Sequence, residues 1–184
     1  MYFLIESIVP EIANKIEENL KNNKINNTII INENFASKEN ISNNKIFLLQ
    51  TLLAKKQLEL NKDFSTNIIS FSNFFYTLSK NFSFLNQKKN FSFFLDIINY
   101  LQITNPNLVI LLTANKHTLN RLYKNKYNEE EINHLLELQN NLINLIEKMN
   151  IKYELINIDF SEKKIKNKIL NILKKRIKKG NKNE

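Results

Sequence analysis

The first residues with chemical potential lie where an apolar run meets a helical pattern. Residues 2–6 alternate little and are typical of a short buried strand, and a helix is expected to begin at Pro10, a residue favoured at the first helical position. Many α/β proteins hold phosphate at such a strand–helix junction. The junction here consists of Glu6, Ser7, Ile8, Val9, Pro10 and Glu11. Whether this junction can bind phosphate depends on the hydrogen-bond donors and the charges that these residues supply.

This junction lacks the groups that hold phosphate in the loop G-x-x-x-x-G-K-[ST]. That loop uses backbone N–H groups, a Lys and a Mg²⁺-binding hydroxyl. The only Gly of the chain is Gly180, and no Lys lies between Glu6 and Glu11. Pro10 has no N–H to donate. Glu11 places a negative charge at the helix start, so local electrostatics are expected to oppose a triphosphate.

Two further segments lie at the ends of expected strands, and ligands of parallel sheets bind beyond the carboxyl ends of the strands. Ser70-Phe71-Ser72-Asn73 lies at the end of the third expected strand, and Thr113-Ala-Asn-Lys116 lies at the end of the fourth. The aromatic residues around this third strand end could stack nucleobases, or they could pack in the core, and we expect the core. These aromatic residues are Phe71, Phe74, Phe75 and Tyr76.

Apolar runs alternate with helical patterns along the whole chain. Strands are predicted over 2–6, 28–32, 66–72, 106–113 and 152–159, and helices over 10–20, 45–62, 90–102, 116–125, 128–150 and 162–179. The nearly all-apolar run 106–113 suits a central parallel strand. The pattern predicts an α/β fold, three-layer α/β/α, with a five-stranded parallel sheet. One domain is expected over 1–178, with a basic disordered tail over 179–184.

Composition narrows the class of protein. The 184 residues carry a formal net charge of +9, no Cys, and only two His, at 117 and 134. This composition offers no thiolate or clustered-His metal site, and no apolar run reaches the roughly 20 residues that cross a bilayer. A cytoplasmic protein is expected. The excess of positive charge could attract nucleic acid. Nearly all basic residues are Lys, however, and Lys cannot make the bidentate contacts with phosphates or bases that Arg makes.

Several segments together are similar to the deoxynucleoside kinase and thymidylate kinase group of P-loop kinases. "FLIES" resembles the first strand of that group, and "FLLQTLLAKKQLEL" its long helix that carries a substrate-contacting Gln or Arg. "NIISFSNFFYTL" resembles its third strand, and "NPNLVILLTANKHTLNRLYKNKYNEEE" its fourth strand, a following helix and the Arg-rich lid. The resemblance covers nearly the whole chain and implies the fold of P-loop nucleoside kinases.

The resemblance implies site residues, and this sequence departs from several of them. Lys55 or Lys56 would stand for the Arg of the long helix, and Arg121 and Lys124 for the lid arginines. Phe71 and Ser72 replace an Asp-Arg pair that would supply the base and a phosphate clamp, and Thr113 stands where Asp is frequent. The substrate-binding residues implied in this way are Lys55, Lys56, Ser70, Arg121 and Lys124. The departures leave no catalytic residue to assign.

Three functions remain open from the sequence. The first is a degenerate thymidylate or deoxynucleoside kinase-like protein, without ATP-dependent phosphotransfer, that binds or scaffolds. The second is an active nucleoside or nucleoside-monophosphate kinase with a non-standard phosphate site, and only this one calls for ATP and Mg²⁺. The third is a basic α/β protein that binds nucleic acid. The resemblance also implies a homodimer, with "NFSFFLDIINYL" as a dimer face, or a heteromer with an active kinase; no membrane partner is expected.

Overall fold

The computed structural model describes residues 1–22, 28–33, 43–124 and 126–180. Five parallel strands form one sheet in the order β2-β3-β1-β4-β5. The strands are β1 (Tyr2–Ser7), β2 (Thr28–Glu33), β3 (Asn67–Ser72), β4 (Leu108–Thr113) and β5 (Tyr153–Asn157). The predicted fold class, a five-stranded parallel sheet within three α/β/α layers, is confirmed.

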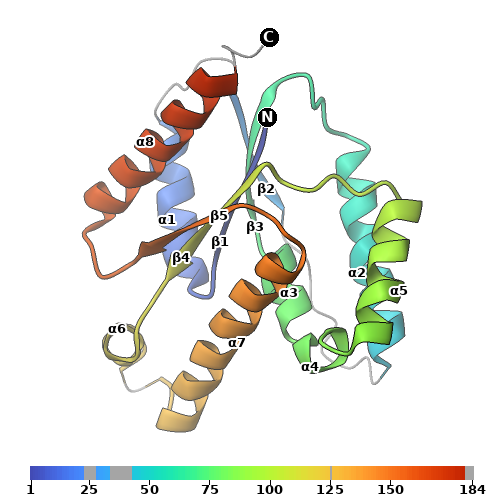
Figure 1. Ribbon diagram of the computed structural model, residues 1–184. Coiled ribbons are helices and arrows are strands. Elements are labelled where there is room, and N and C mark those ends of the chain that lie inside the picture. Colours follow the sequence, from blue (N-terminus) through green and yellow to red (C-terminus); the bar gives the residue numbers. More distant parts are fainter. Residues whose placement is uncertain (23–27, 34–42, 125, 181–184) are drawn as a thin grey trace.

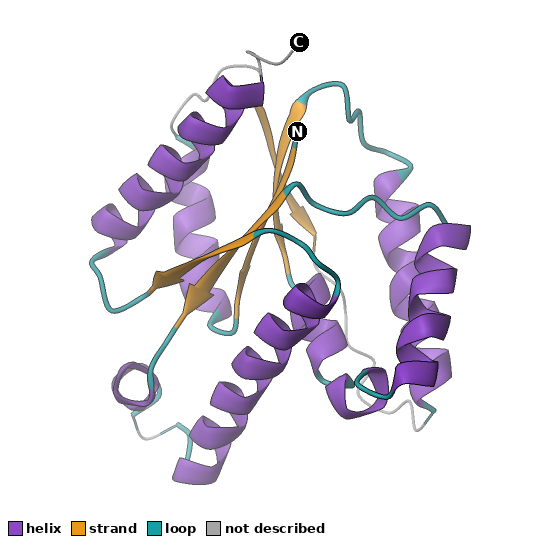
Figure 2. Cartoon of the chain, viewed as in Figure 1, coloured by secondary structure: helices purple, strands orange, loops and turns teal. Residues whose placement is uncertain are grey.

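Helices cover both faces of this sheet (Figures 1 and 2). They are α1 (Pro10–Lys21), α2 (Asn44–Glu59), α3 (Phe74–Ser79), α4 (Phe82–Leu85), α5 (Lys88–Tyr100), α6 (Lys116–Leu122), α7 (Glu129–Lys148) and α8 (Glu162–Gly180). One core joins the sheet to α1, α6 and α8. The other joins it to α2, α3, α4, α5 and most of α7. Side chains near the carboxyl ends of the strands can therefore come from helices on either face of the sheet.

The two central strands are fully enclosed because both of their faces meet a helical layer. In β1, Leu4 faces the α2–α5 core and Ile5 faces the α1–α8 core. The register pairs these two residues with Val109 and Ile110 of β4. All four side chains are at most 1% exposed. A strand with two buried faces reads as a continuous apolar run, which is why β4 could be predicted.

Helix ends follow local capping rules where the sequence supplies them. Asn128 caps α7: its side chain accepts from the backbone N–H of Glu131, and the Glu131 side chain accepts from the N–H of Asn128. Pro10 begins α1, as predicted. α8 continues to Gly180, so only residues 181–184 of the predicted tail remain, and they lie outside the described residues, as does most of the polar segment 33–44.

The segment after β3 differs from the expectation. It forms two short helices, α3 and α4, that the periodicity did not predict. Phe71, Phe74 and Phe75 are buried and Tyr76 is partly buried, which confirms their assignment to the core. Helix α6 ends at Leu122, earlier than the predicted 125. None of the helices that the structure describes is long and apolar enough to cross a membrane.

Candidate functional site

The connection between β1 and α1 is short and filled by apolar side chains. Only Ile8 and Val9 separate the end of β1 from Pro10, and each is 2% exposed. The Ser7 hydroxyl accepts a hydrogen bond from the Val9 N–H (3.0 Å) and donates to the Leu112 carbonyl (3.5 Å). This hydroxyl therefore fastens the connection to β4, and Ile8 and Val9 join the α1–α8 core.

The Glu6 carboxylate, at the carboxyl end of β1, holds the start of α3. It is fully buried, and its two oxygens accept hydrogen bonds from the backbone N–H groups of Phe75 and Tyr76, both at 2.9 Å. Burial raises the pKa of Glu6 to about 8, against the opposing effect of the two N–H donors and Lys55. Glu6 therefore has a structural role, because its side chain caps the N-terminus of α3.

A carboxylate and a phenol meet at the N-terminus of α1. The Tyr123 hydroxyl donates to Glu11 at 3.2 Å, and the Tyr123 ring stacks on Tyr127 with the ring centroids 4.6 Å apart. Burial and the Glu11 charge raise the pKa of Tyr123 well above its usual range. The helix N-terminus that commonly attracts an anion therefore faces a negative group of the chain itself.

Lys55, predicted as a substrate-binding residue, lies in a buried cluster of charges between α2 and the sheet. Its side chain is 2% exposed. The ammonium donates to the Tyr2 hydroxyl (2.6 Å) and to Glu33 (3.2 Å), and it lies 3.5 Å from a Glu59 oxygen. It also lies 5.6 Å from the ring centroid of Phe74. Partners within the chain surround this ammonium.

Glu33 is the centre of the same cluster. It accepts hydrogen bonds from the Ser70 hydroxyl (2.7 Å) and from Lys62 in addition to Lys55. Although burial acts to raise it, the Lys55 and Lys62 charges and the Ser70 bond bring the pKa of Glu33 below its usual range. Burial lowers the pKa of Lys62. The structure thus brings two predicted residues, Lys55 and Ser70, together around a carboxylate.

The other predicted substrate-binding residues lie apart from this cluster. Lys56 is partly exposed and donates to the Gln102 carbonyl at 3.2 Å. Arg121 and Lys124 are exposed on and after α6, which packs with the α1–α8 core on the other face of the sheet from α2 (Figure 1). The five residues therefore do not form one binding surface.

Sequence reasoning missed Tyr2, Glu33, Glu59 and Lys62 as members of the charge cluster. One signal was present: Lys55 and Glu59 are four residues apart, so they share a helix face with each other. They also fall on the apolar side of α2, beside Leu48 and Leu52. Charged residues on a buried face require partners.

Comparisons with known proteins show a structural likeness. No protein-family model and no curated protein matches the sequence. A deoxyadenosine kinase from M. mycoides, with products dCMP and a flexible dCDP bound, superposes with a TM-score of 0.61 at 15% identity, covering 95% of this chain and 99% of that one. A thymidylate kinase from Ehrlichia chaffeensis gives 0.61 at 11% identity, covering 94% and 98%. The M. mycoides enzyme with bound dATP gives 0.55 at 17% identity, covering 95% and 100%.

These neighbours agree with the resemblance read from the sequence. Each covers almost the whole chain and is itself covered almost completely, so the likeness extends over the entire fold. The chain therefore has the fold of the P-loop deoxynucleoside and thymidylate kinases.

Proposed function

We propose that this protein is a degenerate deoxynucleoside or thymidylate kinase-like protein that binds or scaffolds without transferring phosphate from ATP. The observation that carries the proposal is the connection from β1 to α1. Ile8 and Val9 are buried in the core, and Pro10 and Glu11 occupy the first turn of the helix. In a phosphate-binding loop, backbone N–H donors, a Lys and a hydroxyl occupy the corresponding strand–helix connection.

Phosphoryl transfer depends on positioning and on electrostatic stabilisation of the transferred group. A single missing donor of this kind commonly costs on the order of 3 kcal/mol in the transition state. Here the junction has no Lys, its hydroxyl at Ser7 is engaged with Val9 and Leu112, and Glu11 adds a negative charge. Several such losses together support a protein without useful turnover.

An active kinase with a non-standard phosphate site is the second candidate. Exposed cations at Arg121 and Lys124 favour it, since they lie on and beyond α6 and are accessible. Lys55 supports it less, because its ammonium already has Tyr2, Glu33 and Glu59 as partners. In this case ATP and Mg²⁺ would be the cofactors, and replacing Arg121 and Lys124 with Ala would abolish turnover.

Thermal unfolding with and without ligands tests the proposal. We expect no rise in melting temperature with Mg-ATP and no ATP turnover. A rise with one deoxynucleoside or nucleoside monophosphate alone would identify a retained acceptor pocket, since a ligand at 100 times its Kd stabilises by about 2.7 kcal/mol. Turnover of ATP, or stabilisation by Mg-ATP that is lost in the variant with Arg121 and Lys124 replaced by Ala, would contradict the proposal and establish the second candidate.

The third candidate, nucleic-acid binding, concerns the exposed lysines of α8. These are Lys163, Lys164, Lys168, Lys174 and Lys175. Because lysine contacts phosphate without reading bases, we expect weak, sequence-independent binding of single-stranded DNA that falls steeply with salt. Fluorescence anisotropy across a salt series measures the slope. Affinity that does not change with salt would be at odds with contacts through these lysines.

A further inference from the structure

The sequence around α6 combines positive charge with tyrosine. Between Asn115 and Asn128 it contains no Asp or Glu. Its basic residues are Lys116, His117, Arg121, Lys124 and Lys126, and two tyrosines, at 123 and 127, lie among them. Basic residues interleaved with aromatic ones are typical of proteins that bind single-stranded nucleic acid, where the cations contact phosphates and the rings stack on bases.

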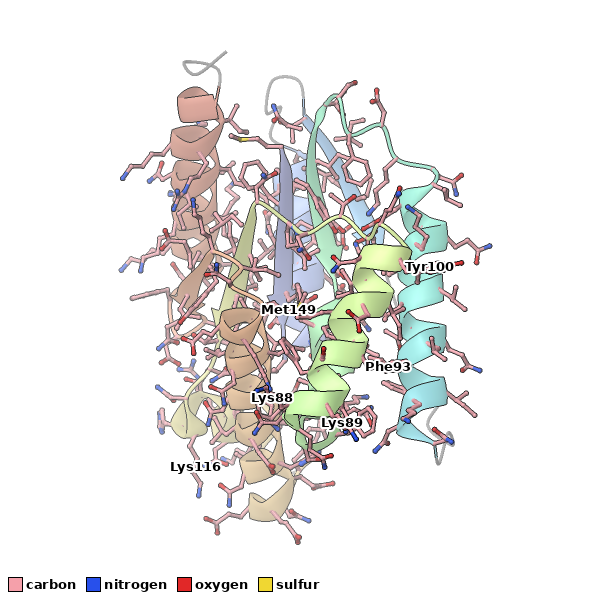
Figure 3. All side chains as sticks on the ribbon, turned by 45° about the vertical axis from the view of Figure 1, so that its right-hand side comes forward. Lys88, Lys89, Phe93, Tyr100, Lys116 and Met149 are labelled. Carbon is pink, nitrogen blue, oxygen red and sulfur yellow. The ribbon has the colours of Figure 1, made fainter. Side chains whose placement is uncertain are left out.

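The outer side of α6 presents several of these basic residues to solvent. Lys116 shares a row of the helix with Asn120, and His117 shares the adjacent row with Arg121, since residues four apart lie on the same helix face. All four side chains are exposed. Figure 3 labels Lys116 on α6, away from α2 and α5. Because α6 follows β4, this basic side lies beyond the carboxyl end of that strand.

Most of these cations have no carboxylate partner in the part of the chain that the structure describes. Lys116 pairs with Glu129 at 2.6 Å. No ion pair among the described residues involves Arg121, Lys124 or Lys126, and all three are exposed. Unpaired cations are available to phosphates, and the Arg121 guanidinium can hold a phosphate through two N–H groups at once.

Tyr127 offers one face of its ring for stacking. Its other face lies on Tyr123, with the ring centroids 4.6 Å apart and the ring planes at 26°. Tyr123 is 7% exposed and its hydroxyl donates to Glu11, whereas Tyr127 is 44% exposed. The exposed area of Tyr127 therefore belongs to its edges and to the face opposite Tyr123. A flat base on that face would extend the existing stack.

Backbone hydrogen bonds hold Tyr127 in this position. The N–H groups of Lys126 and Tyr127 both donate to the Tyr123 carbonyl, at 2.9 Å and 3.2 Å. The next residue, Asn128, is the N-cap of α7. A ring fixed in this way has little conformational freedom left to lose when a ligand binds, which favours affinity.

Neighbouring elements limit where a nucleic acid strand can lie. The first turn of α7 contains Glu129, Glu130 and Glu131, which repel phosphate, so a strand on Tyr127 is expected to follow α6 rather than α7. Helix α8, the site of the third candidate above, has exposed lysines but no aromatic residue. It therefore offers contacts with phosphates alone, whereas the surface at α6 offers phosphate contacts and a ring.

We infer that Arg121, Lys124, Lys126 and Tyr127 form a binding site for single-stranded nucleic acid, in which Tyr127 stacks on a base and the three cations contact phosphates. A single strand fits because its bases are accessible, whereas the bases of a duplex already stack on one another. Such a site gives the binding role proposed above its class of partner, and it rests on that proposal because an active kinase would use the same cations for ATP.

Fluorescence anisotropy with a labelled ten-nucleotide oligo-dT, and with an abasic strand of equal length, tests the stacking. Both strands carry the same phosphates, so only the bases differ. We expect the wild-type chain to bind oligo-dT at least about fivefold more tightly, the lower end of what stacking of one base contributes. Tyr127→Ala should bind the two strands alike. Tyr100→Ala, which removes a tyrosine that is 86% exposed on α5, is the matched control and should keep the preference.

A salt series with oligo-dT tests the phosphate contacts. Each phosphate contact on a single strand contributes about 0.7 to the steepness of log K against log salt. Replacement of Arg121 and Lys124 together with Ala should reduce this steepness by about 1.4. Replacement of Lys174 and Lys175 with Ala, two exposed lysines of α8, should leave it unchanged. A reduction seen only in the α8 variant would overturn the inference in favour of the third candidate.

The wild-type chain alone can also overturn the inference, so the test does not require Tyr127→Ala to fold. Equal affinity for oligo-dT and the abasic strand would exclude stacking, and no binding of oligo-dT at about 50 mM salt would exclude the site. Displacement of oligo-dT by an equimolar amount of Mg-ATP would indicate a mononucleotide site instead. ATP turnover contradicts the proposed function, whereas these oligonucleotide measurements test the site, so the two failures are distinguishable.

Discussion

Replacement of Lys55 with methionine is expected to lower the free energy of unfolding by about 3–5 kcal/mol, the usual cost of breaking a buried ion pair from one side. Methionine fills similar space but removes the charge that compensates Glu33 and Glu59. These carboxylates are 3% and 5% exposed, and among the residues that the structure describes Lys62 would remain as the cation paired with Glu33. The free energy can be measured by urea denaturation with an unchanged m value as the check on two-state unfolding.

The adjacent residue provides a matched control. Lys56→Met alters the same chemistry one position along α2, but the Lys56 ammonium has a single carbonyl partner at the surface. A change of at most about 0.5 kcal/mol is expected there, as for most surface substitutions. Equal effects of the two variants would mean that the cluster around Glu33 contributes no special stability.

This comparison also separates two roles for Lys55. A substrate-binding lysine lost by mutation would leave the fold stable and weaken a ligand. A lysine that neutralises internal carboxylates would destabilise the fold with no ligand present. The contacts with Tyr2, Glu33 and Glu59 favour the second role. Replacement of Ser70 should also destabilise the fold with no ligand present, because its hydroxyl donates to Glu33 as well.

Local patterns predicted most of the framework. The run that became β4 is buried on both faces, so it shows uninterrupted apolar character. The start of α1 at Pro10 and the cap of α7 at Asn128 are set by neighbours in sequence. Helix α3 has no such signal. It has six residues and an aromatic composition, and its start is capped by Glu6, whose partner Phe75 is 69 residues away in sequence.

The charge cluster is equally dependent on contacts between distant segments. Glu33, Lys55 and Lys62 come from the end of β2, from α2 and from the loop after α2. Only the pair Lys55 and Glu59 is visible in the sequence. On α2, the apolar side chain of Leu58 is 37% exposed while the neighbouring charged residue Glu59 is buried. Charge pairing with Lys55 overrode the ordinary hydrophobic pattern there.

Glu6 is expected to make the protein lose stability as the pH rises from about 4.5 to about 8. Its pKa in the folded protein is about 8, whereas the ordinary value for a Glu is 4.5. Between these values the folded protein holds a proton that the unfolded chain has released, so stability falls with rising pH. One pKa unit corresponds to about 1.4 kcal/mol, so the loss is on the order of 4 kcal/mol across the interval.

The variant Glu6→Gln should remove this pH dependence. The amide cannot ionise, so the unfolding free energies at pH 5 and pH 8 should differ less in the variant than in the wild type. Glu137→Gln, which changes a carboxylate exposed on α7, is the control and should keep the wild-type slope. The same slope in wild type and Glu6→Gln would show that Glu6 does not titrate in this range.

Amide hydrogen exchange then links the carboxylate to α3. Above pH 8, where Glu6 is ionised, its carboxylate offers two acceptor oxygens and the Gln side chain offers one, so one of the N–H groups of Phe75 and Tyr76 loses its partner in the variant. That backbone group should exchange faster in the variant, while amides in the middle of β4 should keep their protection. Faster exchange confined to α3 would mean that the acidic residue at the end of β1 holds a helix in place. A Glu6 carboxylate that holds α3 is then not available to bind or activate a ligand at the carboxyl end of β1.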